Sequence, residues 1–124
     1  MGTDQDGKRK TILIADDDPG IVDAIAQFLE EVGYAVRTTV DVTTIGQLAD
    51  GLPDLILLDI RMSGRDGGEI CRQLKRADAT RAIPIIIFSA SKDTERIARD
   101  AGADDFIAKP FDMYQLVEKI ERYV

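Results

Sequence analysis

Short apolar runs recur along the chain and alternate with longer segments in which apolar residues return at helical spacing. A continuous apolar run of roughly 4–8 residues is typical of a strand that is buried on both faces of a parallel sheet. Five segments have this character, and we expect each to form a strand: Thr11–Ala15, Ala35–Thr39, Leu55–Leu58, Ile83–Phe88 and Asp105–Ala108.

After each predicted strand the pattern predicts a helix. The first begins at Asp18, a good N-cap that Pro19 follows, and ends at Gly33. The other four are expected over about Val42–Asp50, over the segment with Ile70, Cys71 and Leu74, over Ser91–Ala101 and after the cap Asp112. Five strand–helix units in a row predict a doubly wound α/β fold, in which helices cover both faces of a parallel sheet in three layers.

The size and composition fit one globular domain. The chain has 124 residues, of which 44% are hydrophobic and 31% charged. We expect a flexible leader over residues 1–9 and the domain over residues 10–124. No apolar run approaches the ~18 residues of a membrane helix, no signal-peptide core is present, and the single Cys71 forms no internal disulfide. These features predict a cytoplasmic protein without membrane contact, and the formal net charge of −7 argues against direct nucleic acid binding.

Polar residues follow four of the predicted strands. Asp16 and Asp17 come after the first strand, Asp59 after the third, Ser89 after the fourth and Lys109 after the fifth. Parallel strands bring their carboxyl ends to one edge of the sheet, where such folds bind ligands. Several carboxylates gathered there repel one another unless a cation is bound, and oxygen ligands suit Mg²⁺. The set therefore predicts a metal site at which Asp59 accepts a phosphoryl group.

Each of these residues also has a simpler interpretation. Asp59 alone would be a polar residue where the chain leaves the sheet, Ser89 a loop hydroxyl or cap, and Lys109 a surface lysine. Asp18 is suited to helix capping. Phe106 fits a core position and a rotamer switch that follows Ser89 equally well. The order of the four segments favours the functional interpretation.

The four segments also carry a family resemblance. The motifs ILIADDDP, LILLDI, FSAS and GADDFIAKPF resemble, in this order, the receiver domain of bacterial response regulators in two-component signalling. The resemblance covers about Lys10 to Val124. It implies a flavodoxin-like fold whose five strands lie in the order 2-1-3-4-5.

The resemblance implies an acceptor and a metal site. Asp59 would be phosphorylated by a histidine kinase or a phosphotransfer protein. Mg²⁺, or alternatively Mn²⁺, would be held by Asp17, Asp59 and the main-chain carbonyl of Arg61, and Asp16 would reach the ion through water.

The resemblance also implies how the phosphoryl group would be sensed. Ser89 and Lys109 would bind it, the peptide bond between Lys109 and Pro110 would be cis, and Ser89 with Phe106 would form the switch. The surface expected to change comprises the fourth helix, the fifth strand and the fifth helix. The protein would be a monomer or a phosphorylation-dependent dimer through this surface, and its downstream target is unknown.

The sequence departs from the family pattern in a few places. Ser63 stands after Met62 where the family commonly has proline, but no ligand is lost. Phe106 replaces the usual tyrosine, so a switch here would work by packing and not through a hydroxyl. Arg61 and Ser91 occupy positions that the family links to the lifetime of the phosphoryl group.

Two other functions compete with the phosphorylation switch. An Mg²⁺-dependent phosphohydrolase that forms an aspartyl phosphate would use similar groups, but the Asp16-Asp17-Asp18-Pro19 motif and the short chain argue against it. We therefore expect no turnover of an exogenous substrate. A degenerate receiver that only binds a partner would not need the full set of site residues. Because no output segment follows Val124, the chain is expected to be a stand-alone regulator or the receiver piece of a longer regulator or hybrid kinase.

Overall fold

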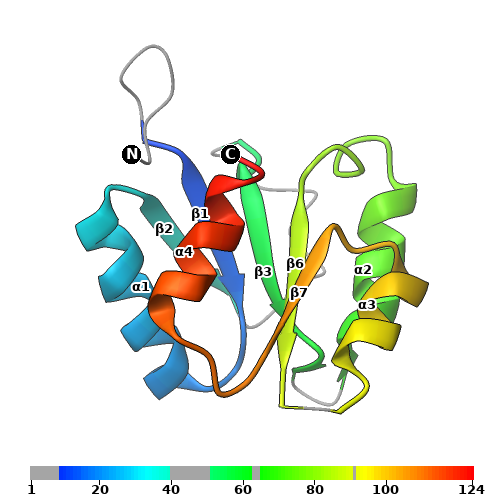
Figure 1. Cartoon of the computed structure of the whole chain (residues 1–124). Helices are drawn as coiled ribbons and strands as arrows, with labels where there is room; N and C mark the ends of the chain where they lie inside the picture. The colour runs from blue at the N-terminus through cyan, green and yellow to red at the C-terminus, as the bar shows by residue number, and fades with distance from the viewer. Residues whose placement is uncertain (1–8, 40–50, 63–64, 91) are drawn as a thin grey trace.

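The structure is a computed structural model that describes residues 9–39, 51–62, 65–90 and 92–124 (Figure 1). Within these ranges the centre of the fold is a parallel sheet in the order β2-β1-β3-β6-β7. Its strands are β1 (Thr11–Ala15), β2 (Ala35–Thr39), β3 (Leu55–Asp59), β6 (Ile85–Ser89) and β7 (Asp105–Ala108). The predicted α/β fold and the strand order 2-1-3-4-5 are confirmed.

Helices cover both faces of this sheet. The helices α1 (Pro19–Val32) and α4 (Met113–Glu121) lie on one face, and α2 (Gly67–Arg76) and α3 (Thr94–Ala101) lie on the other (Figure 1). None of the helices in the described ranges is long and apolar enough to cross a membrane. The helix expected over about Val42–Asp50 and residues 1–8 of the expected leader lie outside the described residues.

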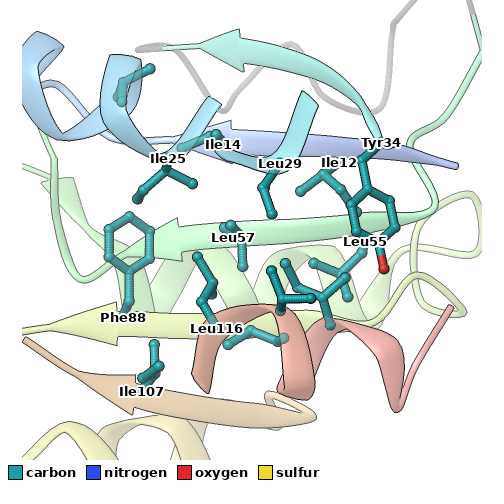
Figure 2. Packing of buried hydrophobic residues seen from close by; sticks show 14 residues of the cluster. Ile12, Ile14, Ile25, Leu29, Tyr34, Leu55, Leu57, Phe88, Ile107 and Leu116 are labelled. Carbon is teal, nitrogen blue, oxygen red and sulfur yellow. The ribbon is translucent and has the colours of Figure 1, made fainter. Parts of the chain in front are cut away.

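The alternation of side chains along each strand divides the buried residues into two cores. On β3, Leu55 and Leu57 belong to the core under α1 and α4, whereas Ile56 and Leu58 belong to the core under α2 and α3. Figure 2 shows the first of these cores, with side chains from β1, β3, β6 and β7 packed beneath α1 and α4. Residues of one parity therefore point to one face, and this rule extends to the residues at the strand ends.

The predicted caps hold α1 and α4 in place. The Asp18 carboxylate accepts hydrogen bonds from the main-chain N–H groups of Gly20 and Ile21, at 3.0 and 3.4 Å. Gly33 ends α1 in the left-handed conformation, with φ of 119°. Asp112 forms a capping box with Gln115 at the start of α4. These caps fix the ends of both helices that lie over the site face of the sheet.

The structure differs from the sequence prediction at the starts of two elements and by one added strand pair. Strand β6 begins at Ile85 and not at Ile83, because the Ile83 N–H donates to Thr80 in a turn and Pro84 has no N–H to donate. Helix α3 begins at Thr94, whereas the helix was expected to start at Ser91, which lies outside the described residues. A short antiparallel pair, β4 (Arg61–Met62) and β5 (Arg65–Asp66), was not predicted.

Candidate functional site

Three carboxylates meet at the carboxyl edge of the sheet. Asp59 is the last residue of β3, and Asp16 and Asp17 directly follow β1, its hydrogen-bonded neighbour. Carboxylate oxygens of the three side chains all lie within 4.8 Å of one another. Asp16 and Asp59 are buried, with 3% and 8% of their surface exposed, whereas Asp17 is exposed. The structure therefore brings together the three acidic residues that the sequence singled out.

The start of α1 holds the Asp16 carboxylate in place. Its Oδ1 atom accepts a hydrogen bond of 3.0 Å from the main-chain N–H of Asp18, which is itself the N-cap of α1. Asp16 also continues the alternation of Ile12 and Ile14 and so lies on the α1 and α4 side of the sheet. The carboxylate is thus oriented by a turn and by a capped helix.

Lys109 supplies a positive charge beside these carboxylates. Its Nζ atom lies 3.4 Å from Asp16 Oδ2 and 3.9 Å from Asp59 Oδ1. The Lys109 N–H donates to the Ser89 carbonyl at 2.8 Å, and the following peptide bond to Pro110 is cis. Of these two carboxylates, Asp16 is the nearer partner of the ammonium. The lysine lies between the two buried carboxylates and is shared by them.

The residue after the β4–β5 pair, Gly67, touches the main chain of the predicted acceptor. The Gly67 N–H donates to the Ile60 carbonyl at 2.6 Å. A Cβ atom at this position would overlap the Asp59 carbonyl oxygen and lie 2.7 Å from Ile60 Cα. The loop that begins at Asp59 is therefore closed by a contact that only glycine permits. The sequence pattern alone does not predict this contact.

Two other predicted residues, Ser89 and Arg61, lie at the same edge of the sheet but further along the strand direction than Asp59. Asp59 is in register with Phe88, so that Ser89, which is 4% exposed, lies one residue beyond Asp59 along the sheet edge. Arg61 lies in β4, two residues after Asp59, opposite Asp66. The structure thus gathers Asp16, Asp17, Asp59 and Lys109 into one cluster, with Ser89 adjacent along the sheet edge.

Phe106 lies away from the cluster, on the edge strand β7. Its half-buried ring packs against the core under α2 and α3, and the Lys119 Nζ atom of α4 lies 5.6 Å from the ring centroid. Lys119 also pairs with Asp105 at 3.1 Å. Burial alone would raise the pKa of Asp105, but hydrogen bonds from the Phe106 N–H, Lys119 and Tyr123 outweigh it and lower that pKa. A fixed charge pair therefore borders the predicted switch residue.

Two hollows flank the acidic cluster. One, of about 440 Å³, is lined by Asp16, Asp17 and Asp23 together with residues at the end of β2. The other, of about 480 Å³, lies between α1 and the loop before α4, is mostly apolar, and has Lys109 in its wall. The cluster can therefore be approached from the surface beside α1.

The arrangement suits a hard divalent cation and an incoming anion. The three carboxylates offer only oxygen ligands, which Mg²⁺ prefers and which do not favour softer metals. An ammonium such as that of Lys109 can bind phosphoryl oxygens, and the neighbouring carboxylate on the buried central strand has the chemistry of a phosphoryl acceptor. The residues present therefore fit a magnesium-assisted phosphoryl site.

Comparisons with known proteins agree with this geometry. The family model of the response regulator receiver domain matches residues 12–121. The chain is 40% identical over 115 residues to the phosphate regulon transcriptional regulatory protein PhoB of Pseudomonas aeruginosa, covering 90% of this chain and 50% of that protein. It is 44% identical over 115 residues to the nisin biosynthesis regulatory protein NisR of Lactococcus lactis, covering 89% and 48%.

A solved structure gives the same result. The signal receiver domain of a signal transduction histidine kinase from Syntrophus aciditrophicus superposes with a TM-score of 0.82 at 32% identity, over 92% of this chain and 89% of that one. The fold and the family match define a signalling domain of the flavodoxin-like class. The chain belongs to the response regulator receiver domain family of two-component systems. It spans about half the length of the curated relatives that it matches.

Proposed function

We propose that this chain is a phosphorylation switch in which Asp59 accepts a phosphoryl group from a phosphohistidine of a histidine kinase or phosphotransfer protein. A carboxylate oxygen of Asp59 forms the new bond to phosphorus while the phosphorus–nitrogen bond breaks and the imidazole leaves. The observation that carries the proposal is the cluster of Asp16, Asp17 and Asp59 with Lys109 between two of its members.

Asp16, Asp17 and Asp59, with the main-chain carbonyl of Arg61, would hold the metal. Bound there, Mg²⁺ would offset the negative charge of the phosphoryl oxygens during transfer. Lys109 already lies within 4 Å of two carboxylate oxygens, and its three N–H donors allow it to bind the transferred group as well. Ser89, beside the acceptor on β6, would donate a further hydrogen bond.

The new charge would change the surface formed by α3, β7 and α4. A phosphoryl group adds roughly −1.5 to −2 charges and several strong acceptors. Ser89 would move toward it, and Phe106 would repack into the space that the serine leaves. The altered surface would then bind a downstream partner or a second copy of the chain. The chain acts in this proposal as a signal carrier and does not turn over an external substrate.

Phosphorylation by a small acyl phosphate tests the proposal directly. We expect the intact protein to gain the mass of one phosphoryl group in the presence of Mg²⁺ and a small acyl phosphate. Asp59→Asn should abolish the gain, whereas the exposed Asp100→Asn on α3 should leave it unchanged. No gain in the wild type, or an equal gain in Asp59→Asn, would overturn the proposal. Turnover of an exogenous phosphomonoester would instead favour the phosphohydrolase.

A further inference from the structure

An aromatic ring lies beneath the ammonium of Lys109. The Nζ atom is 4.7 Å from the centroid of the Phe88 ring, well within the ~6 Å over which a cation is attracted to a ring face. Phe88 is 1% exposed, so the contact is on the buried side of the lysine. The lysine stem itself is mostly buried, with 19% of its side chain exposed. The ammonium is therefore bounded by two carboxylates and one ring.

The ring is itself held in a fixed orientation. Phe111 meets Phe88 edge to face, with ring centroids 6.2 Å apart and planes at 89°. Figure 2 shows the ring of Phe88 standing off β6 at one end of the core under α1 and α4. Because Phe88 is in register with Asp59, the ring stands next to the acceptor on the neighbouring strand. The buried side of the Lys109 ammonium is therefore bounded by a side chain of the hydrophobic core.

The ionic contacts alone hold Lys109 loosely. Its distances of 3.4 and 3.9 Å to the two carboxylates are long for charged hydrogen bonds, which usually measure about 2.7–2.9 Å. A lysine stem is flexible and loses much rotamer freedom when its end is fixed. A second attraction on the buried side restricts the stem without occupying the N–H donors that face the carboxylates.

We propose that Phe88 is a positioning residue, whose ring face holds the Lys109 ammonium toward the phosphoryl site. This inference rests on the proposed function, since Lys109 is taken to bind the transferred group. Phe88 acts through the quadrupole of its ring, so an aliphatic side chain of similar size would fill the space but would not hold the charge. Loss of the attraction should slow phosphorylation of Asp59 roughly two- to fivefold.

Stepwise fluorination of the Phe88 ring separates this role from packing. Replacing Phe88 with mono-, di- and trifluorophenylalanine weakens the ring quadrupole in steps while the shape changes little. We expect the rate of phosphorylation by a small acyl phosphate with Mg²⁺ to fall progressively along the series. Phe88→Leu should be at least as slow as the most fluorinated variant. A rate that stays flat along the series, with only Phe88→Leu slowed, would show packing alone and overturn the proposal.

Phe28 provides the matched control. Its ring also makes an edge-to-face contact, with Tyr114 at 5.6 Å, but it lies on α1 among the residues packed against the same core. Fluorination at Phe28 should leave the rate unchanged, and an equal decline there would overturn the proposal. A wild-type protein that takes no phosphoryl group refutes the proposed function instead.

A second measurement needs no phosphoryl donor. Protons on the end of the Lys109 side chain should be shifted upfield by the ring current of Phe88 in the NMR spectrum of the free protein. Phe88→Leu should remove this shift. Equal shifts in the wild type and in Phe88→Leu would show that the ring does not face the ammonium and would overturn the proposal whatever the kinetics.

Discussion

The sheet has a mostly buried lysine at each end, and the two lysines are bonded in different ways. At the amino end, Lys75 of α2 lies 2.6 Å from Asp104 Oδ2 and donates to the Ile83 carbonyl at 2.8 Å. At the carboxyl end, Lys109 has its two carboxylate partners at 3.4 and 3.9 Å. The exposed fractions of the two side chains are nearly equal, at 18% and 19%, so burial does not account for the difference.

The difference separates a structural charge from one available for ligand binding. Lys75 has a further contact with the Arg81 carbonyl at 3.4 Å, and its partner Asp104 also accepts the Ile85 N–H. Its donors are therefore used to join α2, β6 and the approach to β7. Lys109 is shared between carboxylates at long distances, and in the proposed function a phosphoryl group takes over its hydrogen bonds. The short hydrogen bonds of Lys75 stabilise the fold, whereas the long, shared contacts of Lys109 suit a charge that changes partner.

Removing the charge at the carboxyl end should have the largest effect. We expect Lys109→Met to slow phosphorylation of Asp59 on the order of 10²–10³-fold, because a donor aimed at the transferred group is lost. The same change should tighten Mg²⁺ binding, since a cation no longer repels the metal from the three carboxylates. Intact-mass time courses and titration calorimetry measure the two effects. An unchanged rate, or weaker metal binding, would contradict the role of Lys109.

Disturbing the main chain at the carboxyl end should have the second-largest effect, in this case on stability. We expect Gly67→Ala to lower the free energy of unfolding by about 3 kcal/mol, because its Cβ would meet the main chain of Asp59 and Ile60. The Mg²⁺ affinity of the folded protein should fall as well. Gly68→Ala is the matched control, since its Cβ would lie 3.2 Å from the side chains of Asp66 and Ile97, which can move. Urea unfolding of both variants measures the difference, and equal losses would refute the specific contact at Gly67.

Removing the charge at the amino end should lower stability without slowing phosphorylation. Lys75→Met leaves the Ile83 carbonyl and Asp104 without their charged donor, and we expect a loss of about 2 kcal/mol of unfolding free energy. The rate of phosphorylation per folded molecule should stay unchanged. This variant is the reciprocal control for Lys109→Met. A slowed rate in fully folded Lys75→Met would mean that the two ends of the sheet are not separable.

Acid should weaken the amino end through Asp105, with the smallest effect. Since the folded-state pKa of Asp105 is lowered, its stabilising contribution is present above the unfolded value of about 3.9 and is lost as pH falls through the folded value. Asp105→Asn should therefore be less stable than the wild type near neutral pH, by less than about 1 kcal/mol. This difference in unfolding free energy between Asp105→Asn and the wild type should disappear in acid. Unfolding curves from about pH 6 down to about pH 2.5 would reveal it, and a gap that widens in acid would refute the assignment.

The pattern of apolar and polar positions along the strands is enough to predict much of the site as well as the fold. Continuous apolar runs located the sheet, and the parity of Asp59 with Leu55 and Leu57 places it on the α1 and α4 face. Parity also groups Asp16 and Lys109 with it, so the main cluster follows from spacing and topology. The flanking motifs then made the family resemblance specific.

Contacts that depend on the path of a loop could not be predicted in this way. The antiparallel pair around Arg61 and Asp66 has two residues per strand, too few to produce a periodic pattern. The closeness of Gly67 to Asp59 and the preference of Lys109 for Asp16 depend on distances of a few tenths of an ångström. The ring under Lys109 follows from packing, because an apolar residue at position 88 predicts only a buried strand.

The edge-to-face pair of Phe88 and Phe111 has an optical consequence. The chain contains no tryptophan, so the native protein has no indole emission to follow. Phe111 is half-buried and one ring away from the ammonium of Lys109. An indole introduced at that position would be close enough for its emission to respond to the electric field of the site. The aromatic pair thus offers a built-in position for a fluorescent probe that reports the charge state next to Asp59.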